Sequence, residues 1–241
     1  MGNQKCYIGW DVGAWNCDKN KSSRDAIVIL DSNGKLLGFK RGNLRESITN
    51  AQSTNEILIK LFQWCGLSYF NEEIVMAIDT PLGFSEAFVK LITHYSIEAE
   101  INDFQKNPYL YRKSEHFLFE KEEKPLSAVN HMIGAQATKG IHFLSKFAPI
   151  IESLGIWKSS NRKLTVIETY PTANNEFIMI PEILKEKLDN SENENINQDV
   201  KDAYICAEIA KRFDQNKGTF YQPLQSIHEK EGWIWVLKKN K

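Results

Sequence analysis

The feature that constrains this chain most is the segment Lys5–Gly13, KCYIGWDVG, in which an apolar run ends in a carboxylate and a glycine. The apolar residues of the run are of the types that favour buried strands. Asp11 disfavours a strand, and at the end of a buried strand its charge must be solvated, paired or bound to a cation. Gly13 allows a sharp turn or a close approach to a ligand. The segment therefore indicates a strand that carries a carboxylate at its end, and a strand followed by an ordinary Asp turn is the alternative.

Two later apolar runs end in the same way. Residues 74–78 (IVMAI) are followed by Asp79 and then TPLG, and residues 164–167 (LTVI) are followed by Glu168. Near-continuous apolar runs are typical of strands covered on both faces, as in a parallel sheet. Sites in such sheets lie beyond the carboxyl ends of the strands, where the three acids would meet. Taken singly, Asp79 also fits a turn before proline, and Glu168 also fits a surface charge at a strand end.

The hydrophobic pattern of the remaining chain predicts a mixed α/β fold. Strands at 26–30 and 35–40, joined by a DSNG turn, would form an antiparallel three-strand meander with the first strand. Helical periodicity favours helices over 49–65, 85–96, 128–154, 181–188 and 199–213, with Phe88, Val89, Leu91 and Ile92 facing inward in the second of these. A last strand is expected at 232–237, and the polar stretch 189–198 is expected to be a mobile loop.

Composition limits the class of protein. A chain of 241 residues with 42% hydrophobic residues suits one domain, here 1–241 with a helical insertion at about 98–160. The net charge of −1 does not indicate a globally basic nucleic-acid binder, so such binding would need local Lys and Arg. Four cysteines without paired spacing predict no zinc site and favour a reducing compartment. With no membrane-length apolar run and no signal peptide, we expect a cytoplasmic protein without a membrane partner.

A late helix offers two more acids. Asp199 and Asp202 are three residues apart and would lie on one helical face. Several carboxylates gathered at one sheet edge repel one another unless a cation or shared protons offset their charge. Hard oxygen ligands of this kind suit Mg²⁺ or Mn²⁺. Asp199 could instead be a helix N-cap, and Asp202 a first-turn acid favoured by the helix dipole.

The segment YRKSEH at 111–116 offers a different kind of group. Arg112 could contact a substrate phosphate, with Glu115 supporting it. A solvated surface pair is the alternative. The sequence contains neither a Walker A loop nor a GxGxxG motif.

These segments together resemble a known family. The matching pieces are IGWDVG at 8–13, AIDTPLG at 77–83, RKSE at 112–115, IETYP at 167–171, DVKDA at 199–203 and EGWI at 231–234. The chain resembles the domain of unknown function 429 family, described as predicted nucleases of the ribonuclease H-like fold. Its late helix is also similar to that of bacterial Holliday-junction resolvases, in which a His or Asp stands three residues before the last catalytic Asp.

The resemblance implies a ribonuclease H-like mixed sheet flanked by helices. It also implies a metal-binding core of Asp11, Asp79 and Asp202, with Glu168 and Asp199 as auxiliary catalytic ligands. The function it favours is metal-dependent nuclease activity on nucleic acid, which two ions could support in phosphodiester cleavage. A non-enzymatic nucleic-acid-binding or scaffold protein is the alternative. An actin-like nucleotide-binding phosphotransferase is a third, although that architecture needs two such domains.

Overall fold

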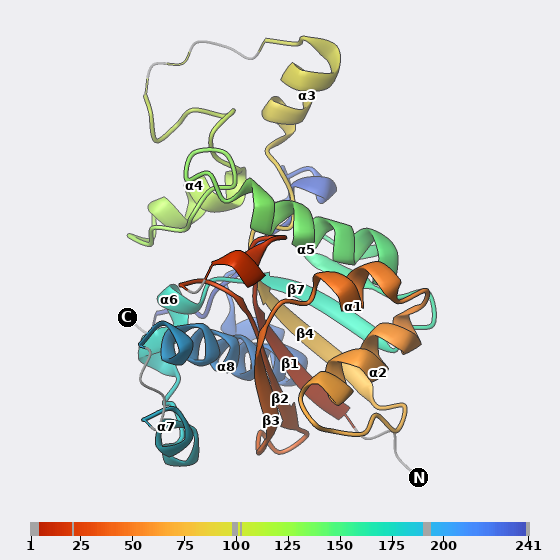
Figure 1. The fold of residues 1–241 in the computed structure, drawn as a ribbon. Coiled ribbons are helices and arrows are strands. Elements are labelled where there is room, and N and C mark those ends of the chain that lie inside the picture. Colours follow the sequence, from red (N-terminus) through yellow and green to blue (C-terminus); the bar gives the residue numbers. More distant parts are fainter. Residues whose placement is uncertain (1–4, 21, 98–100, 102, 190–193, 240–241) are drawn as a thin grey trace.

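A computed structural model describes residues 5–20, 22–97, 101, 103–189 and 194–239 of the chain (Figure 1). The described strands form one mixed sheet in the order β3-β2-β1-β4-β7-β6-β5, and β8 pairs with β7. Their bounds are β1 Lys5–Asp11, β2 Asp25–Asp31, β3 Leu36–Gly42, β4 Glu73–Asp79, β5 Ile150–Ser153, β6 Ile156–Lys158, β7 Leu164–Thr169 and β8 Ile234–Trp235. The prediction of a mixed α/β fold with parallel and antiparallel strands is confirmed.

The first three strands form the expected antiparallel meander. β1 pairs antiparallel with β2, and β2 pairs antiparallel with β3. The turn between β2 and β3 ends at Gly34, whose φ of 84° suits glycine. On its other side β1 pairs in parallel with β4, and β4 pairs in parallel with β7. The strands that end in Asp11, Asp79 and Glu168 are therefore three neighbours that run in the same direction.

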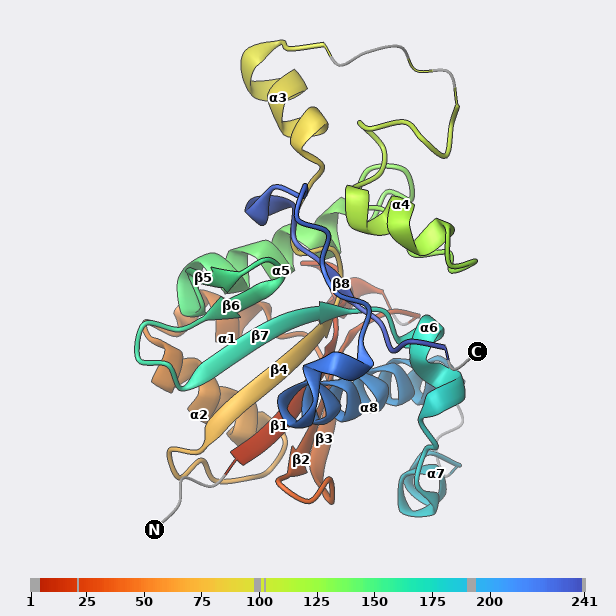
Figure 2. The same ribbon diagram turned by 180° about the vertical axis from the view of Figure 1, so that it is seen from behind.

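Helices cover both faces of the sheet (Figures 1 and 2). One face packs against α1 Arg45–Asn50, α2 Thr54–Trp64 and α5 Gly134–Phe147. The long helix α8 Glu194–Gln215 covers the other face, beside α6 Pro171–Asn174 and α7 Glu182–Asp189. Beyond the carboxyl ends of the parallel strands lie α3 Glu86–His94 and α4 Lys113–Phe119. Short 3₁₀ turns complete the described elements at Cys17–Lys19, Asn175–Phe177, Lys217–Thr219 and Glu229–Glu231.

Several predicted helix bounds are wrong. The expected helix over 49–65 is two helices, because Ser53 is extended and its side chain accepts a hydrogen bond from the Glu56 N–H, capping α2. The expected helix over 128–154 shortens to α5, and residues 150–158 form the β5–β6 hairpin, in which Gly155 has a φ of 74°. The final helix starts earlier than predicted, at Glu194, so part of the expected loop at 189–198 is helical and residues 190–193 lie outside the described part.

The inward face predicted for the helix at 85–96 is also wrong. Within α3 the side chains of Val89 and Ile92 are 42% and 57% exposed, and Ala87 is the residue that is buried. The helix extends away from the sheet toward one end of the molecule, so its apolar stripe has no core to cover (Figure 1). Amphipathic spacing shows that a helix has an apolar side, but it does not show what that side meets.

The expected helical insertion at about 98–160 is not helical throughout. Helix α4 and its flanking loops lie outside the sheet layers, whereas α5 packs on the sheet and β5 and β6 extend it. The segment that stands apart from the sheet therefore ends near residue 133. Among the described residues, none of the helices combines the length and apolar character needed to cross a bilayer.

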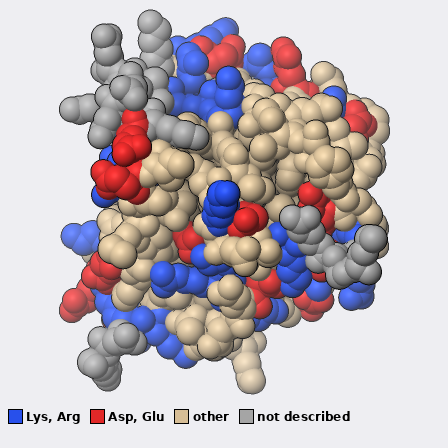
Figure 3. All heavy atoms as spheres, turned by 90° about the horizontal axis from the view of Figure 1, so that it is seen from below, with Lys and Arg blue, Asp and Glu red and all other residues tan. Residues whose placement is uncertain are grey.

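Charge is mixed on the face seen from below. Figure 3 shows Lys and Arg interspersed with Asp and Glu among uncharged residues. Such a distribution produces no strong field of one sign over that face.

Candidate functional site

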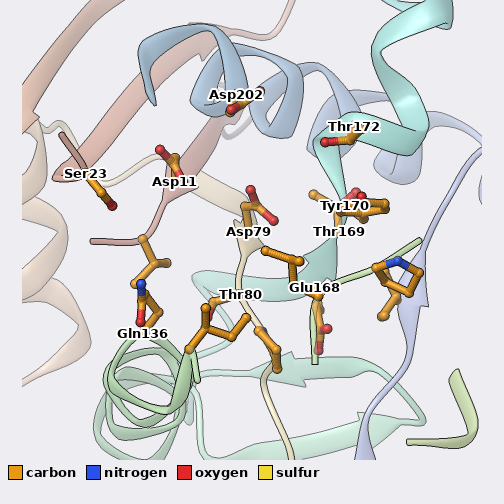
Figure 4. A pocket seen from close by; sticks show the side chains of 16 residues that line it. Asp11, Ser23, Asp79, Thr80, Gln136, Glu168, Thr169, Tyr170, Thr172 and Asp202 are labelled. Atoms are coloured by element: carbon orange, nitrogen blue, oxygen red, sulfur yellow. The ribbon is translucent and has the colours of Figure 1, made fainter. Parts of the chain in front are cut away.

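Four carboxylates line one pocket at the carboxyl ends of the parallel strands, and three of them, Asp11, Asp79 and Asp202, have no ion pair to Lys or Arg among the described residues. Asp11 and Asp79 are register partners on β1 and β4, and Asp202 reaches the same pocket from α8. The pocket has a volume of about 350 Å³, and Figure 4 shows the three side chains around its upper part. The structure thus brings together the three residues that the resemblance implied as a metal-binding core.

A glycine sets the distance between α8 and the sheet. A Cβ built on Gly9 would lie 1.9 Å from the Ala203 carbonyl oxygen and 2.3 Å from the Ala207 nitrogen. Only a residue without a side chain lets the helix backbone rest directly on β1. Asp202 precedes Ala203, and Asp11 lies two residues after Gly9 on the same strand face. The close contact between strand and helix therefore fixes the position of Asp202 over the strand ends.

Burial and mutual repulsion raise the pKa values of these three acids. Burial, followed by the neighbouring charges of Asp79, Asp199 and Asp202, raises the pKa of Asp11 well above its usual value. Burial and the charges of Asp202 and Glu168 do the same to the pKa of Asp79. Burial raises the pKa of Asp202 to about 6, although a hydrogen bond from Gln198 opposes that rise. The cluster favours either shared protons or a bound cation.

Glu168 also lines this pocket, but its carboxylate is paired with Arg112. Its two oxygens accept hydrogen bonds from the Arg112 guanidinium at 2.5 and 2.9 Å, and one of them also accepts the Leu82 N–H at 2.8 Å. Its register partner on β4 is Ile78, which belongs to the core under α2 and α5 rather than to the α8 face. Glu168 therefore contacts a different set of groups from Asp11 and Asp79.

Asp199 is also held by an arginine. Its carboxylate accepts a hydrogen bond from Arg41 Nε at 2.6 Å and another from the Arg24 N–H at 3.1 Å. Burial raises its pKa, and these two donors lower it. Asp199 lies one helical turn before Asp202, and its contacts tie α8 to β3 and to the loop before β2.

Arg112 occupies a buried position in the structure. Besides Glu168, its guanidinium donates to Glu115 at 2.9 Å and to the Glu231 carbonyl oxygen at 3.1 Å. The side chains of Arg112 and Glu115 are 3% and 1% exposed. The solvated pair expected as the alternative is therefore wrong, and the guanidinium joins α4 to β7 instead of facing solvent.

Comparisons with known proteins supply no relative. The chain matches no protein-family model, no curated protein and no solved structure. Function is therefore inferred from the residues of the site, because a fold alone does not imply an activity.

The pocket carboxylates are the type of ligand that a divalent cation prefers, but their side chains are not arranged as a complete set of ligands. Within the described ranges, no three His, Cys, Asp or Glu side chains form a ready group of metal ligands. In the same ranges no Lys or Arg forms an ion pair with Asp11, Asp79 or Asp202. The Thr80 hydroxyl, beside Asp79 and on the pocket wall, is buried without a hydrogen-bond partner. Oxygen donors that form no ion pair with Lys or Arg fit Mg²⁺ or Mn²⁺.

Sequence reasoning missed a buried ion pair next to Asp11. Lys139 of α5 and Asp25 of β2 are both fully buried, and their charged atoms are 2.5 Å apart. Asp25 also accepts hydrogen bonds from Trp10 Nε1 and the Gly13 N–H at 3.0 Å, while Lys139 donates to the Gly13 carbonyl oxygen at 3.2 Å. The pair fixes the chain on both sides of Asp11. No local pattern marks it, because Lys139 stands in an ordinary helical sequence.

Proposed function

We propose that this chain is a divalent-metal-dependent nuclease that hydrolyses a phosphodiester of nucleic acid. The observation that carries the proposal is the convergence of Asp11, Asp79 and Asp202, from two parallel strands and a helix, on one pocket, where none of them forms an ion pair with a described Lys or Arg. Such a cluster repels itself when ionised, so a cation is the natural partner of its charged form.

Each pocket residue has a distinct part in the proposal. Asp11 and Asp79 would hold Mg²⁺ or Mn²⁺ as carboxylates, and Asp202 would complete the set of ligands. When bound, the cation supplies positive charge beside the phosphorus and lowers the pKa of a bound water. Water would add to phosphorus as the bond to the leaving oxygen breaks, and one water proton would end on that oxygen.

Glu168 and Asp199 are assigned auxiliary roles at the same site. Glu168 accepts the Leu82 N–H and so fixes the turn that follows Asp79. Asp199 lies one turn from Asp202, and its ion pair with Arg41 fixes the start of the helix segment that carries Asp202. Arg112 acts in this proposal through Glu168 rather than on a phosphate.

The ribonuclease H-like fold and membership of the domain of unknown function 429 family are part of the proposal. The antiparallel meander β1–β3, the parallel strands β4 and β7, and the late helix α8 bearing Asp202 support them. The described strands form one sheet, which gives no support to a two-domain actin-like phosphotransferase.

A titration of Mn²⁺ into wild type and Asp11→Asn tests the proposal. Heat of binding and thermal stability would be followed together, and cleavage of a linear single-stranded oligonucleotide would be measured on the same samples. We expect wild type to bind Mn²⁺, to gain stability and to cleave, and Asp11→Asn to lose all three.

The matched control is Asp103→Asn, an exposed loop carboxylate that does not line the pocket. It should behave as wild type. Cleavage that survives Asp11→Asn unchanged would contradict the mechanism, and an absence of both binding and cleavage in wild type would favour the scaffold alternative.

A further inference from the structure

The pocket below the carboxylates has a volume suited to one small ligand. Its far wall is apolar and comes from the segment before α5, from the loop after β4 and from β8, with lining residues Pro81, Pro125, Leu126, Ile133 and Ile234. At about 350 Å³ it has the size of pockets that enclose one small ligand. Asp11, Asp79 and Asp202 lie around the upper part of this space, and Glu168 lies lower (Figure 4).

The charges of the wall argue against a chain of phosphates inside the pocket. Among the described residues no Lys or Arg lines it. Besides Asp11, Asp79 and Asp202, the lining holds Glu168, whose charge is paired with Arg112. The remaining polar lining groups are uncharged: Ser23, Thr80, Gln136, Thr169, Tyr170 and Thr172. A bound polynucleotide needs cationic side chains along its backbone. A single phosphoester needs only the positive charge of the divalent cation that the carboxylates would bind. The pocket therefore fits a substrate portion with one phosphate and one uncharged body.

The aromatic ring of Tyr170 offers a stacking surface for the uncharged part of the substrate. Tyr170 follows β7, lines the pocket, and donates its hydroxyl to the Lys124 carbonyl oxygen at 2.9 Å. This hydrogen bond ties the ring to the segment that carries Pro125 and Leu126, so ring and apolar wall form one surface. A nucleobase stacks on an aromatic ring whatever its sequence, because every base has a π-face.

We propose that the pocket binds a single nucleotide unit, with its base against Tyr170 and the apolar wall and its phosphate at the carboxylates. The substrate is then the terminal nucleotide of a single strand or a free nucleotide ester, and not the interior of a duplex, whose bases remain stacked and paired. This inference rests on the proposed function.

Binding of a nucleoside 5′-monophosphate and of inorganic phosphate, each with Mg²⁺, tests the pocket without requiring turnover. We expect the nucleotide to bind at least tenfold more tightly than phosphate in wild type and in Tyr170→Phe, which keeps the ring. Tyr170→Ala should lose that advantage, and Tyr95→Ala, which changes an exposed ring away from the pocket, should keep it. Equal binding of nucleotide and phosphate in wild type would overturn the inference.

Cleavage of one single-stranded sequence in linear and in circular form tests the need for an end. We expect the linear form to be degraded to mononucleotides and the circular form to persist. A nucleoside 5′-(4-nitrophenyl) phosphate, cleaved faster than the linear strand, would identify the free ester as the source. If circular and linear strands were cut alike and Asp11→Asn abolished both, the nuclease proposal would stand and the single-unit pocket would be wrong.

Discussion

At the scale of single residues, the site depends on which acids have a cation beside them. Glu168 and Asp199 each have an arginine within 2.6 Å, whereas Asp11 and Asp79 lie in parallel register with no such partner among the described residues. Five acids that look alike in the sequence thus divide into two kinds. The paired acids hold the structure together, whereas the unpaired ones have raised pKa values and would ionise fully only beside a bound cation.

The buried pair of Lys139 and Asp25 allows a sharp test of stability. Lys139→Met leaves the Asp25 carboxylate buried without its cation, which typically costs about 3–5 kcal/mol. The free energy of unfolding in urea would measure the loss. Lys60→Met is the matched control, because the Lys60–Glu56 pair is partly exposed to solvent and should contribute less than about 1 kcal/mol. Equal losses in the two variants would contradict the role assigned to burial.

Asp202 should make stability depend on pH when no metal is present. Its pKa rises from its ordinary value to about 6 on folding, so the folded protein binds the proton more tightly than the unfolded chain. Stability is therefore highest below the unfolded pKa and falls as pH rises toward and past 6. Relative to wild type, Asp202→Asn should gain about 1–3 kcal/mol between pH 4 and pH 8.

Thermal unfolding of the two proteins in chelator across that pH range would measure this difference. A gap that stays constant with pH would rule out a raised pKa at Asp202. The variant Asp103→Asn, changed at an exposed loop carboxylate, should follow wild type throughout.

At the scale of elements, the site is made by the contact of α8 with β1. Gly9→Ala would place a methyl group inside contact distance of the Ala203 and Ala207 backbones. Because backbone atoms cannot give way as a flexible side chain can, we expect a loss of about 3 kcal/mol in unfolding free energy. The displaced helix should also carry Asp202 away from the strand ends and weaken Mn²⁺ binding.

Gly134→Ala is the control for that substitution. A Cβ at Gly134 meets only the Ala128 carbonyl oxygen, at 3.8 Å, in ordinary contact. Alanine also favours the helix more than glycine does, so stability should stay the same or rise by up to about 1 kcal/mol. Calorimetric Mn²⁺ titration of both variants would separate a general loss of stability from a displaced helix.

At the scale of the whole molecule, one buried network joins the segment outside the sheet to the site. Arg112 links α4 to Glu168 on β7, and the Leu82 N–H after β4 meets the same carboxylate. The Lys113 N–H also donates to the Glu231 side chain near the chain end, at 3.3 Å. The start of α4, the turn after β4 and the end of β7 therefore share one set of hydrogen bonds.

Arg112→Met should loosen that junction. Two buried carboxylates, Glu168 and Glu115, would lose their cation, at a cost of about 3–5 kcal/mol. Limited proteolysis should cut the segment 113–133 faster than in wild type, and urea unfolding should show the lower stability. Lys113→Met, which loses only an exposed contact to the Ser226 carbonyl oxygen, should resist proteolysis as wild type does.

The sequence by itself determined the strands that end in acids and the meander that begins the chain. Those features are local, because apolar runs, turn residues and an Asp at a strand end act over a few neighbouring positions. The same local signals misplaced the ends of the helix over 128–154 and the apolar face of α3. The length of a helix and the direction of its apolar face depend on the segments that pack against it. A short stretch of sequence does not contain that information.

Only the tertiary structure decided which acids pair with an arginine. Asp79 and Glu168 end neighbouring strands in similar ways, yet Glu168 meets Arg112 from 56 positions away along the chain. The buried Lys139–Asp25 pair joins residues separated by 114 positions. The charge state of a carboxylate depends on burial and on nearby charges, and both are set by contacts between distant segments.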